Sequence, residues 1–282
     1  TLFPIDDNVL DYLRLTGRNP SDIEFVEAYA RAQGVFGSRE DRRYARINEL
    51  DLGSVELSLA GPSRPHNRVT PAGLKQRFEE ASAAHGHADM GERWSVSCVD
   101  GHDYEIGHGA LAIAAITSCT TATDPAMMVA AGLAARHARE AGLAPRPWVN
   151  RILAPGSHAA SLILERAGLL DDLRAVGFST CGFGCMSCIG NSGEILSCLK
   201  PLASEVELTS VLSGNRNFDG RISPDVAQNF LAQPALVVAY SLVGTMDVEL
   251  SRDPIGTSAS GAPVYLADIM PTSGEIQAVL DE

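Results

Sequence analysis

The strongest constraint on the fold is an unbroken apolar run at residues 110–116, which contains only alanine, leucine and isoleucine. Such a run is typical of a strand in a parallel sheet, because helices cover both faces of such a sheet. From about residue 104 onward, strand-like and helix-like patterns alternate. We expect strands at 149–153 and 206–212, helices at 124–142 and 157–176 with a break at Gly168, and another apolar element at 234–243. This alternation predicts an α/β fold of three layers, αβα, with a mostly parallel sheet.

The first hundred residues have a different pattern. We expect helices within 1–45, a strand at 49–59, and a helix followed by a linker at 73–97. A chain of 282 residues is long enough to form two domains. We therefore predict one domain at 1–100 and a second at 101–282.

Charge and hydropathy exclude several classes of protein. The chain carries 35 acidic and 22 basic residues, a formal net charge of −13. General binders of nucleic acid or anionic membranes carry a basic face, so any basic site here must be small and local. We find no apolar stretch long enough for a transmembrane helix and no signal peptide, and we expect a cytoplasmic protein that binds no membrane. Because the chain begins with Thr1, we expect it to be processed or cut from something longer.

The segment richest in chemistry is 181–193, which places three cysteines among glycines. Cys119 follows the predicted buried strand, and ligand sites of parallel sheets form at the carboxyl ends of strands. A loop bearing Cys185 and Cys188 can therefore meet Cys119. Six cysteines in 282 residues are too few for a disulfide scaffold, so reduced thiols, a metal or a redox site fit better.

Several kinds of site are compatible with this spacing. Structural zinc takes four ligands, which Cys181 or one of His102, His108 and His158 would complete. An iron–sulfur cluster with three cysteines leaves one iron open as a Lewis acid. A redox pair of the thioredoxin type is disfavoured, because that motif starts a regular helix; ordinary buried cysteines are the remaining interpretation. His137 is expected on a helix that faces solvent.

A second candidate segment, 213–221, follows a predicted strand and contains Arg216 and Arg221. Paired arginines suit carboxylate ligands, because the planar guanidinium binds a carboxylate through two parallel hydrogen bonds. From the pattern alone, a solvated turn with surface arginines is the favoured alternative.

Three motifs, taken in this order, resemble the aconitase family. They are AAITSCT at 114–120, GFGCMSCIGNSG at 182–193 and SGNRNFDGR at 213–221. The spacing of the cysteines resembles the cytosolic and bacterial branch, which includes iron regulatory proteins. Shorter stretches fit as well, so the resemblance covers nearly the whole chain; they lie at 3–6, 11–13, 154–157 and 264–269.

By that resemblance, Cys119, Cys185 and Cys188 hold a [4Fe-4S] cluster whose fourth iron binds substrate. Cys181 and Cys198 match no ligand position and are then structural. The implied fold is that of the aconitase iron–sulfur domain, with the chain spanning parts of the family's second and third domains.

The implied activity is that of a hydro-lyase or isomerase, the reversible dehydration–hydration of a tricarboxylic hydroxy acid, as in citrate to isocitrate through cis-aconitate. Asn215 is then expected near the cluster, with Arg216 and Arg221 at the carboxylates of a tricarboxylate or related acid. The family's acid–base groups fall upstream of Thr1 and beyond Glu282, so no general base is assigned. We expect a fragment, a chain completed by further domains or by a partner chain, or a remnant without activity alone.

Two departures from the family pattern lie beside the cysteines. Thr121 stands where the family usually has asparagine, and Glu194 where it commonly has proline. They favour a diverged paralogue, and an isomerase of another acid, for example phosphinomethylmalate, is the alternative. The acidic charge and the missing domains disfavour RNA binding, which iron regulatory relatives show without the cluster. A zinc or redox Cys-x-x-Cys domain is the other functional class.

Overall fold

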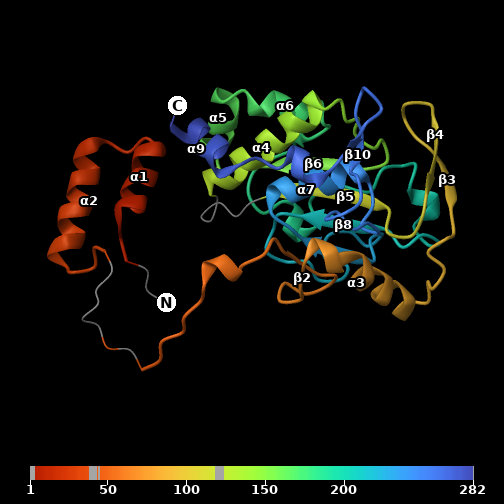
Figure 1. Cartoon of the computed structure of the whole chain (residues 1–282), viewed down its shortest axis with the longest axis horizontal. Coiled ribbons are helices and arrows are strands. Elements are labelled where there is room, and N and C mark those ends of the chain that lie inside the picture. The colour runs from red at the N-terminus through yellow and green to blue at the C-terminus, as the bar shows by residue number, and fades with distance from the viewer. Residues whose placement is uncertain (1–3, 38–42, 44, 118–123, 282) are drawn as a thin grey trace. The chain divides into compact units, whose positions relative to one another are not determined.

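The computed structural model of the chain describes residues 4–37, 43, 45–117 and 124–281. The chain divides into two compact units, Thr1–Val55 and Glu56–Glu282 (Figure 1). The domain boundary predicted near residue 100 refers to the family's domains and stays a prediction.

The described residues of the first unit form two α-helices, as expected: α1 (Asp7–Leu15) and α2 (Pro20–Ala32). Gly17 and Gly34 follow their ends with φ angles of +78° and +66°, a conformation that glycine adopts without strain. The short 3₁₀ helix η1 (Leu52–Ser54) lies near the end of this unit.

The strand predicted at 49–59 is wrong, since within it only Leu59 belongs to a strand, β1 (Leu59–Ala60). Val55 and Leu57 alternate with polar residues as in a strand, but their side chains are 58% and 39% exposed. An alternating segment forms a strand only where a neighbouring strand accepts its hydrogen bonds, and η1 occupies part of this segment instead.

The second unit is built on a seven-stranded sheet of described residues, in the order β2-β1-β9-β8-β5-β6-β7. Pairings between β5 and β6, β5 and β8, β6 and β7, and β8 and β9 are parallel, whereas β1 pairs with β2 and β9 in antiparallel fashion. The strands of the sheet are β1, β2 (Arg68–Val69), β5 (Leu111–Thr117), β6 (Asn150–Ala154), β7 (Ser179–Thr180), β8 (Thr209–Leu212) and β9 (Gln228–Leu231). The predicted α/β fold with a mostly parallel sheet is therefore confirmed.

Strand β5 lies inside the sheet, and all seven of its residues are buried, as the apolar run predicted. Helix α7 (Pro234–Val243) packs against β5 and β8, and it also contacts α4 (Pro125–Glu140). Figure 1 shows α4, α5 (His158–Arg166), α6 (Leu169–Ala175) and α9 (Ser273–Asp281) grouped together, with α3 (Pro71–Ala84) beside β2. Among the described residues, no helix is both long enough and apolar enough to cross a membrane.

The helical break predicted at Gly168 is confirmed, because this residue has a φ of +67° between α5 and α6. The linker expected after α3 is partly wrong: it contains β3 (Trp94–Ser97), which pairs with β4 (Asp103–Ile106) in a separate hairpin. The remaining elements are short: η2 (Ser187–Ile189), η3 (Lys200–Leu202), β10 (Gly256–Thr257), β11 (Pro263–Val264) and α8 (Leu266–Ile269).

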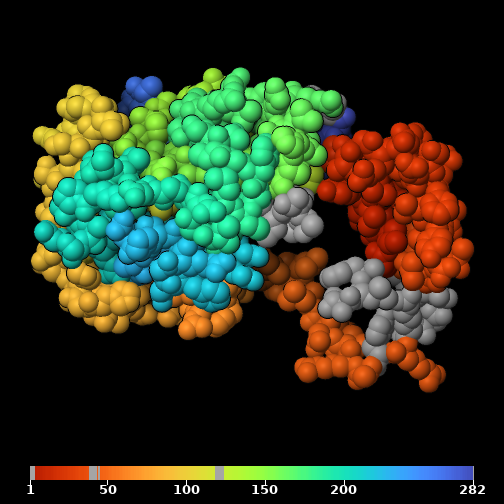
Figure 2. All heavy atoms as spheres, turned by 180° about the vertical axis from the view of Figure 1, so that it is seen from behind, coloured from red at the N-terminus to blue at the C-terminus, as the bar shows by residue number. Residues whose placement is uncertain are grey.

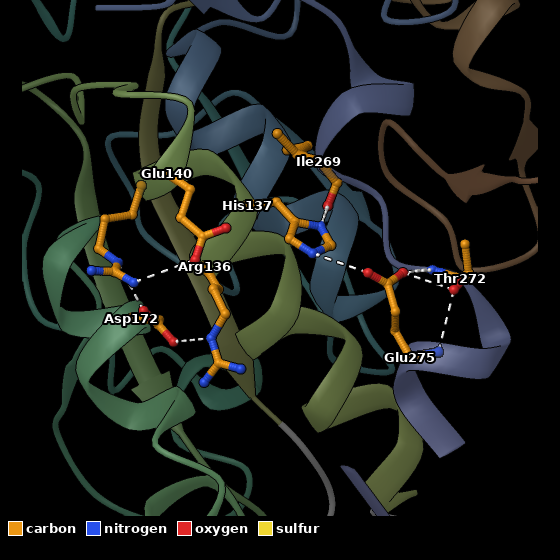
Figure 3. Close-up of polar contacts among 8 residues, drawn as sticks. Arg136, His137, Glu140, Asp172, Ile269, Thr272 and Glu275 are labelled. Atoms are coloured by element: carbon orange, nitrogen blue, oxygen red, sulfur yellow. Dashed lines mark hydrogen bonds and ion pairs between the residues drawn. The ribbon is translucent and has the colours of Figure 1, made fainter. Parts of the chain in front are cut away.

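Polar contacts fix α4 among its neighbouring helices (Figure 3). The buried carboxylate of Asp172 on α6 accepts a hydrogen bond from Nε of Arg136 at 2.7 Å and forms an ion pair with Arg139, whose Nε lies 2.9 Å from Oδ1. On another side of α4, His137 lies 3.1 Å from the carbonyl oxygen of Ile269 and 3.3 Å from Glu275 Oε1. The expectation that His137 lies on a solvent-facing helix is wrong, because α8 and α9 pack over that part of α4.

Candidate functional site

Loops from distant parts of the chain meet at the carboxyl ends of β5, β6 and β8. Thr117 is the last residue of β5. Its N–H donates to the Ser213 hydroxyl after β8 at 2.9 Å, and its carbonyl oxygen accepts a hydrogen bond from that hydroxyl at 2.8 Å. Its own hydroxyl donates to the Gly184 carbonyl at 2.9 Å, and the Gly184 N–H donates to the Pro155 carbonyl after β6 at 2.8 Å. The segments that carry the predicted motifs thus come together at one edge of the sheet, and Figure 2 shows the segments between about 180 and 230 side by side on one face.

Cys188 is the buried member of the Cys-x-x-Cys pair, at 3% exposure, whereas Cys185 is exposed. Backbone N–H groups of Asn215 and Arg216 are directed at the Cys188 sulfur. Burial raises the pKa of Cys188 above its ordinary 9.0, and the charge of Cys185 adds to this. The two N–H groups and the Arg221 guanidinium act in the opposite direction, since each stabilises a thiolate. The site therefore contains a buried sulfur whose thiolate form is stabilised by N–H donors.

Glycine makes this close approach possible. A Cβ atom on Gly214 would stand 2.0 Å from the Cys188 sulfur, so no side chain fits at this position. Gly190, at a φ of +80°, packs so closely that a Cβ there would lie 2.9 Å from the Arg221 carbonyl oxygen. The glycines of both motifs thus bring segment 181–193, the cysteine loop, and segment 213–221, the arginine loop, into backbone contact.

The two candidate arginines differ in their surroundings. Nε of the half-buried Arg221 donates to the Cys188 carbonyl oxygen at 2.6 Å, which ties the two loops together. A guanidinium has five N–H donors, so this bond holds Arg221 in place without exhausting its capacity. Asn215 and Arg216 are exposed on the same loop. The buried Asn217, which the sequence reasoning did not single out, anchors this loop by donating to the Asn229 carbonyl at 2.7 Å.

Cys119 and Thr121 lie outside the described residues, so their predicted roles stay predictions. Among the residues that are described, no three or more His, Cys, Asp or Glu side chains gather as a metal-binding group. Cys181 is exposed and donates its S–H to the Ser179 carbonyl at 3.2 Å. The four-thiolate set through Cys181 therefore has no support in the described part of the chain.

The three candidate histidines lie in different places. The ring of His158 at the start of α5 is 4.3 Å from that of Phe183, beside the cysteine loop. His108 precedes β5, at the opposite end of the strand from Thr117, where its Nδ1 accepts the Glu207 N–H at 3.0 Å. His102 lies in the turn between β3 and β4. Of the three, His158 is the one placed near Cys185 and Cys188.

Glu194, one of the two departures from the family pattern, is 79% exposed and pairs with Lys200 Nζ at 2.6 Å. A hydrogen bond and the positive charge of Lys200 lower the pKa of Glu194. The Glu194 carbonyl accepts a hydrogen bond of 3.0 Å from Asn150 in β6. The end of the cysteine loop is therefore fixed to the sheet through its backbone.

Comparisons with known proteins agree with this arrangement. Over 99% of its length, the chain is 50% identical to a phosphinomethylmalate isomerase of Streptomyces viridochromogenes and 45% identical to an aconitate hydratase A of Deinococcus radiodurans. It is 44% identical, again over 99% of its length, to an aconitate hydratase A of Escherichia coli. In each case it covers 32% of the relative, so the chain spans about a third of the length of these curated proteins. The sequence model of the Aconitase family (aconitate hydratase) matches residues 1–244, and this match, together with the joining of the three motifs at one edge of the sheet, shows that the chain belongs to the aconitase family.

Proposed function

We propose that this chain is the cluster-bearing core of an aconitase-type hydro-lyase, which interconverts hydroxy acids by reversible dehydration and hydration. A [4Fe-4S] cluster would be held by Cys119, Cys185 and Cys188, and when bound it supplies an iron without a protein thiolate as a Lewis acid for a substrate hydroxyl. The observation that carries the proposal is the packing of the buried Cys188 sulfur against the backbone of Gly214, in the loop that contains Arg216 and Arg221.

The residues that are described fit such a group. Hydrogen bonds to a cysteine sulfur stabilise its anionic form, which is the form that binds iron. The absence of a side chain at Gly214 keeps the backbone against the Cys188 sulfur, and burial of Cys188 keeps water away from it. Cys119 follows Thr117 by two residues, and Thr117 is bonded to the cysteine loop through Gly184.

The chain's own part in the reaction is binding and orientation of the acid. Arg216 and Arg221 each present a guanidinium, the group best suited to a carboxylate, and Asn215 adds an amide beside them. The bond from Arg221 to the Cys188 carbonyl fixes that guanidinium relative to the cysteine loop. The substrate is proposed to be a tricarboxylate, and further domains or a partner chain are proposed to supply the acid–base groups. Because the cluster requires reduced thiols, we place the protein in the cytoplasm.

The test is iron and acid-labile sulfide per chain after anaerobic reconstitution, read together with visible absorption. We expect about four of each in the wild-type chain, as a [4Fe-4S] cluster requires. Cys188→Ser should lose most of both, because it removes the buried ligand. Cys181→Ser is the matched control: it alters an exposed cysteine of the same loop and should leave both contents unchanged.

Retention of full iron and sulfide by Cys188→Ser, or an equal loss in Cys181→Ser, would contradict the ligand assignment. If the chain instead contains one zinc and shows no visible absorption, the site is a zinc site and not an iron–sulfur cluster.

A second candidate substrate follows from the relative named phosphinomethylmalate isomerase, at 50% identity. Citrate and phosphinomethylmalate can be compared by adding each to the reconstituted chain and following the electron paramagnetic resonance of the reduced cluster. A change of the spectrum on adding citrate supports a tricarboxylate substrate. A change on adding phosphinomethylmalate but not citrate supports phosphinomethylmalate as the substrate.

A further inference from the structure

Two cysteines outside the proposed cluster lie next to each other, although a hundred residues separate them. Cys98 follows β3, and Cys198 lies just before η3. Their sulfur atoms are 3.6 Å apart, and the Cys98 thiol donates a hydrogen bond to the Cys198 sulfur. Figures 1 and 2 agree in showing the β3–β4 hairpin beside the segment around residue 200.

The backbone holds both partners in this position. Cys98 starts a tight turn, in which its N–H donates to the His102 carbonyl at 3.1 Å and its carbonyl accepts from the Gly101 N–H at 3.0 Å. On the other side, Leu199 donates to the Leu196 carbonyl at 2.9 Å and closes a turn around Cys198. The approach of the sulfurs is therefore a property of two ordered turns.

The two thiols differ in their access to solvent. Cys98 is 7% exposed, whereas Cys198 is partly exposed. Burial, the hydrogen bond to Cys198 and the negative charges of Cys198 and Asp100 raise the pKa of Cys98 to about 12. Cys98 consequently stays protonated at neutral pH, and Cys198 is the sulfur that a small oxidant reaches first.

We propose that Cys98 and Cys198 form an intramolecular disulfide when hydrogen peroxide reaches the chain. The Cys198 sulfur attacks one peroxide oxygen, the O–O bond breaks, and a sulfenic acid and one water are formed. The Cys98 sulfur then displaces the hydroxyl from Cys198, which forms the S–S bond and releases a second water. The two thiols together lose two electrons and two protons, and the peroxide takes up both.

The movement needed is small, because the sulfurs must close from 3.6 Å to the bond length of about 2.05 Å. The resulting bond ties the β3–β4 hairpin to segment 195–205, which directly follows the cysteine loop of the proposed cluster. The two sites share no residue, so this disulfide can form whether or not the cluster is present.

Digestion after glutamate isolates this pair from every other cysteine. Cys98 falls in peptide 93–105 and Cys198 in peptide 195–205. The other cysteines fall in peptides 106–140 and 166–194. The reduced full chain is treated with hydrogen peroxide, its remaining thiols are alkylated in denaturant, and the peptides are analysed by mass spectrometry without reduction.

We expect a linked 93–105/195–205 peptide that disappears on reduction and on Cys198→Ser, and that persists in the control Cys181→Ser. The folded chain should yield at least about tenfold more of it than the chain unfolded in urea, because folding holds the sulfurs together. Equal yields from folded and unfolded wild-type chain, which need no variant to fold, would overturn the proposal. So would over-oxidised Cys198 beside a Cys98 that remains free to alkylate.

Discussion

Gly214 and Cys188 touch, backbone against sulfur, at the point where the cysteine loop meets the arginine loop. A methyl group at Gly214 would clash with Cys188, because its carbon would lie 2.0 Å from the sulfur. We expect Gly214→Ala to displace Cys188 and to lower the iron retained after reconstitution by more than half. The same substitution should destabilise the fold by about 1–3 kcal/mol, the usual cost of overpacking.

Gly274→Ala serves as its control, because a Cβ there would meet its nearest neighbour, the Thr272 hydroxyl oxygen, at 3.9 Å. Iron content should match that of the wild type, and the urea midpoint should be equal or higher, because Gly274 lies in α9 and alanine favours a helix. Equal iron retention by the two variants would show that the contact does not position the cysteine.

Gly132 tests the packing of α4 against α6. A Cβ at this position would lie 2.6 Å from Leu169 Cβ, well inside contact distance. Replacing glycine by alanine inside a helix normally stabilises it by about 1 kcal/mol, but the overlap should outweigh this gain. We expect Gly132→Ala to lower the free energy of unfolding by about 1–2 kcal/mol, measured by urea denaturation. An unchanged or raised midpoint would mean that the two helices separate at little cost.

Asp172 joins α6 to α4 through two arginines. Its side chain is 8% exposed, and Asp172→Ala leaves Arg136 and Arg139 without their shared carboxylate. Because both arginines are partly exposed, water compensates some of this loss, and we expect a cost of about 2 kcal/mol. Its neighbour Asp171 is 85% exposed, so Asp171→Ala should leave the urea midpoint unchanged. Similar urea midpoints for the two variants would show that the contacts of Asp172 with the two arginines do not stabilise the fold.

Glu207 should make stability depend on pH in the acidic range. Burial alone raises its pKa, but hydrogen bonds from Gln228, His85 and Ser82 outweigh burial and hold the pKa below its ordinary 4.5. A carboxylate whose pKa is lowered by folding stabilises the fold fully above 4.5, and this contribution is lost as the pH falls through the lowered value. Urea midpoints of the wild type should therefore fall steeply below pH 4.5.

Glu207→Gln removes the titrating group, so its midpoint should change less between pH 5 and pH 3 than that of the wild type. Parallel losses in the two proteins would assign the acid sensitivity to other carboxylates.

Local patterns predicted the parts of the fold that depend on local physics. The apolar run at 110–116 predicted β5, and the helix predicted at 124–142 is α4, which begins after Asp124, whose carboxylate accepts the Ala126 N–H. The β3–β4 hairpin was missed, because its strands are short and half exposed. His137 was misjudged because α9, which approaches it from more than a hundred residues away, leaves no sign in the sequence around it.

For the candidate site, too, local sequence patterns predicted some features and tertiary packing determined the others. The rule that ligands bind at the carboxyl ends of strands predicted that the loop bearing Cys185 and Cys188 meets Cys119, which lies outside the described residues, so this stays a prediction. The family resemblance, and not the residue pattern, predicted that Arg216 and Arg221 belong to the same site, and Arg221 does contact the Cys188 backbone. The direction of the Asn215 and Arg216 N–H groups depends on backbone angles that the sequence does not state. The pairing of Cys98 with Cys198 was hidden for another reason, since contacts between distant turns follow from tertiary packing alone.

The sheet ends on both sides in strands of only two residues, β2 and β7. A two-residue edge offers an approaching chain very few unpaired backbone groups, so a foreign strand gains little by docking there. The long, apolar strand β5 lies in the interior of the sheet. At an edge of the sheet, it would be the segment most prone to pair with a foreign strand. The strand order thus gives the folded chain resistance to edge-to-edge aggregation, and that protection should last only as long as β5 stays covered.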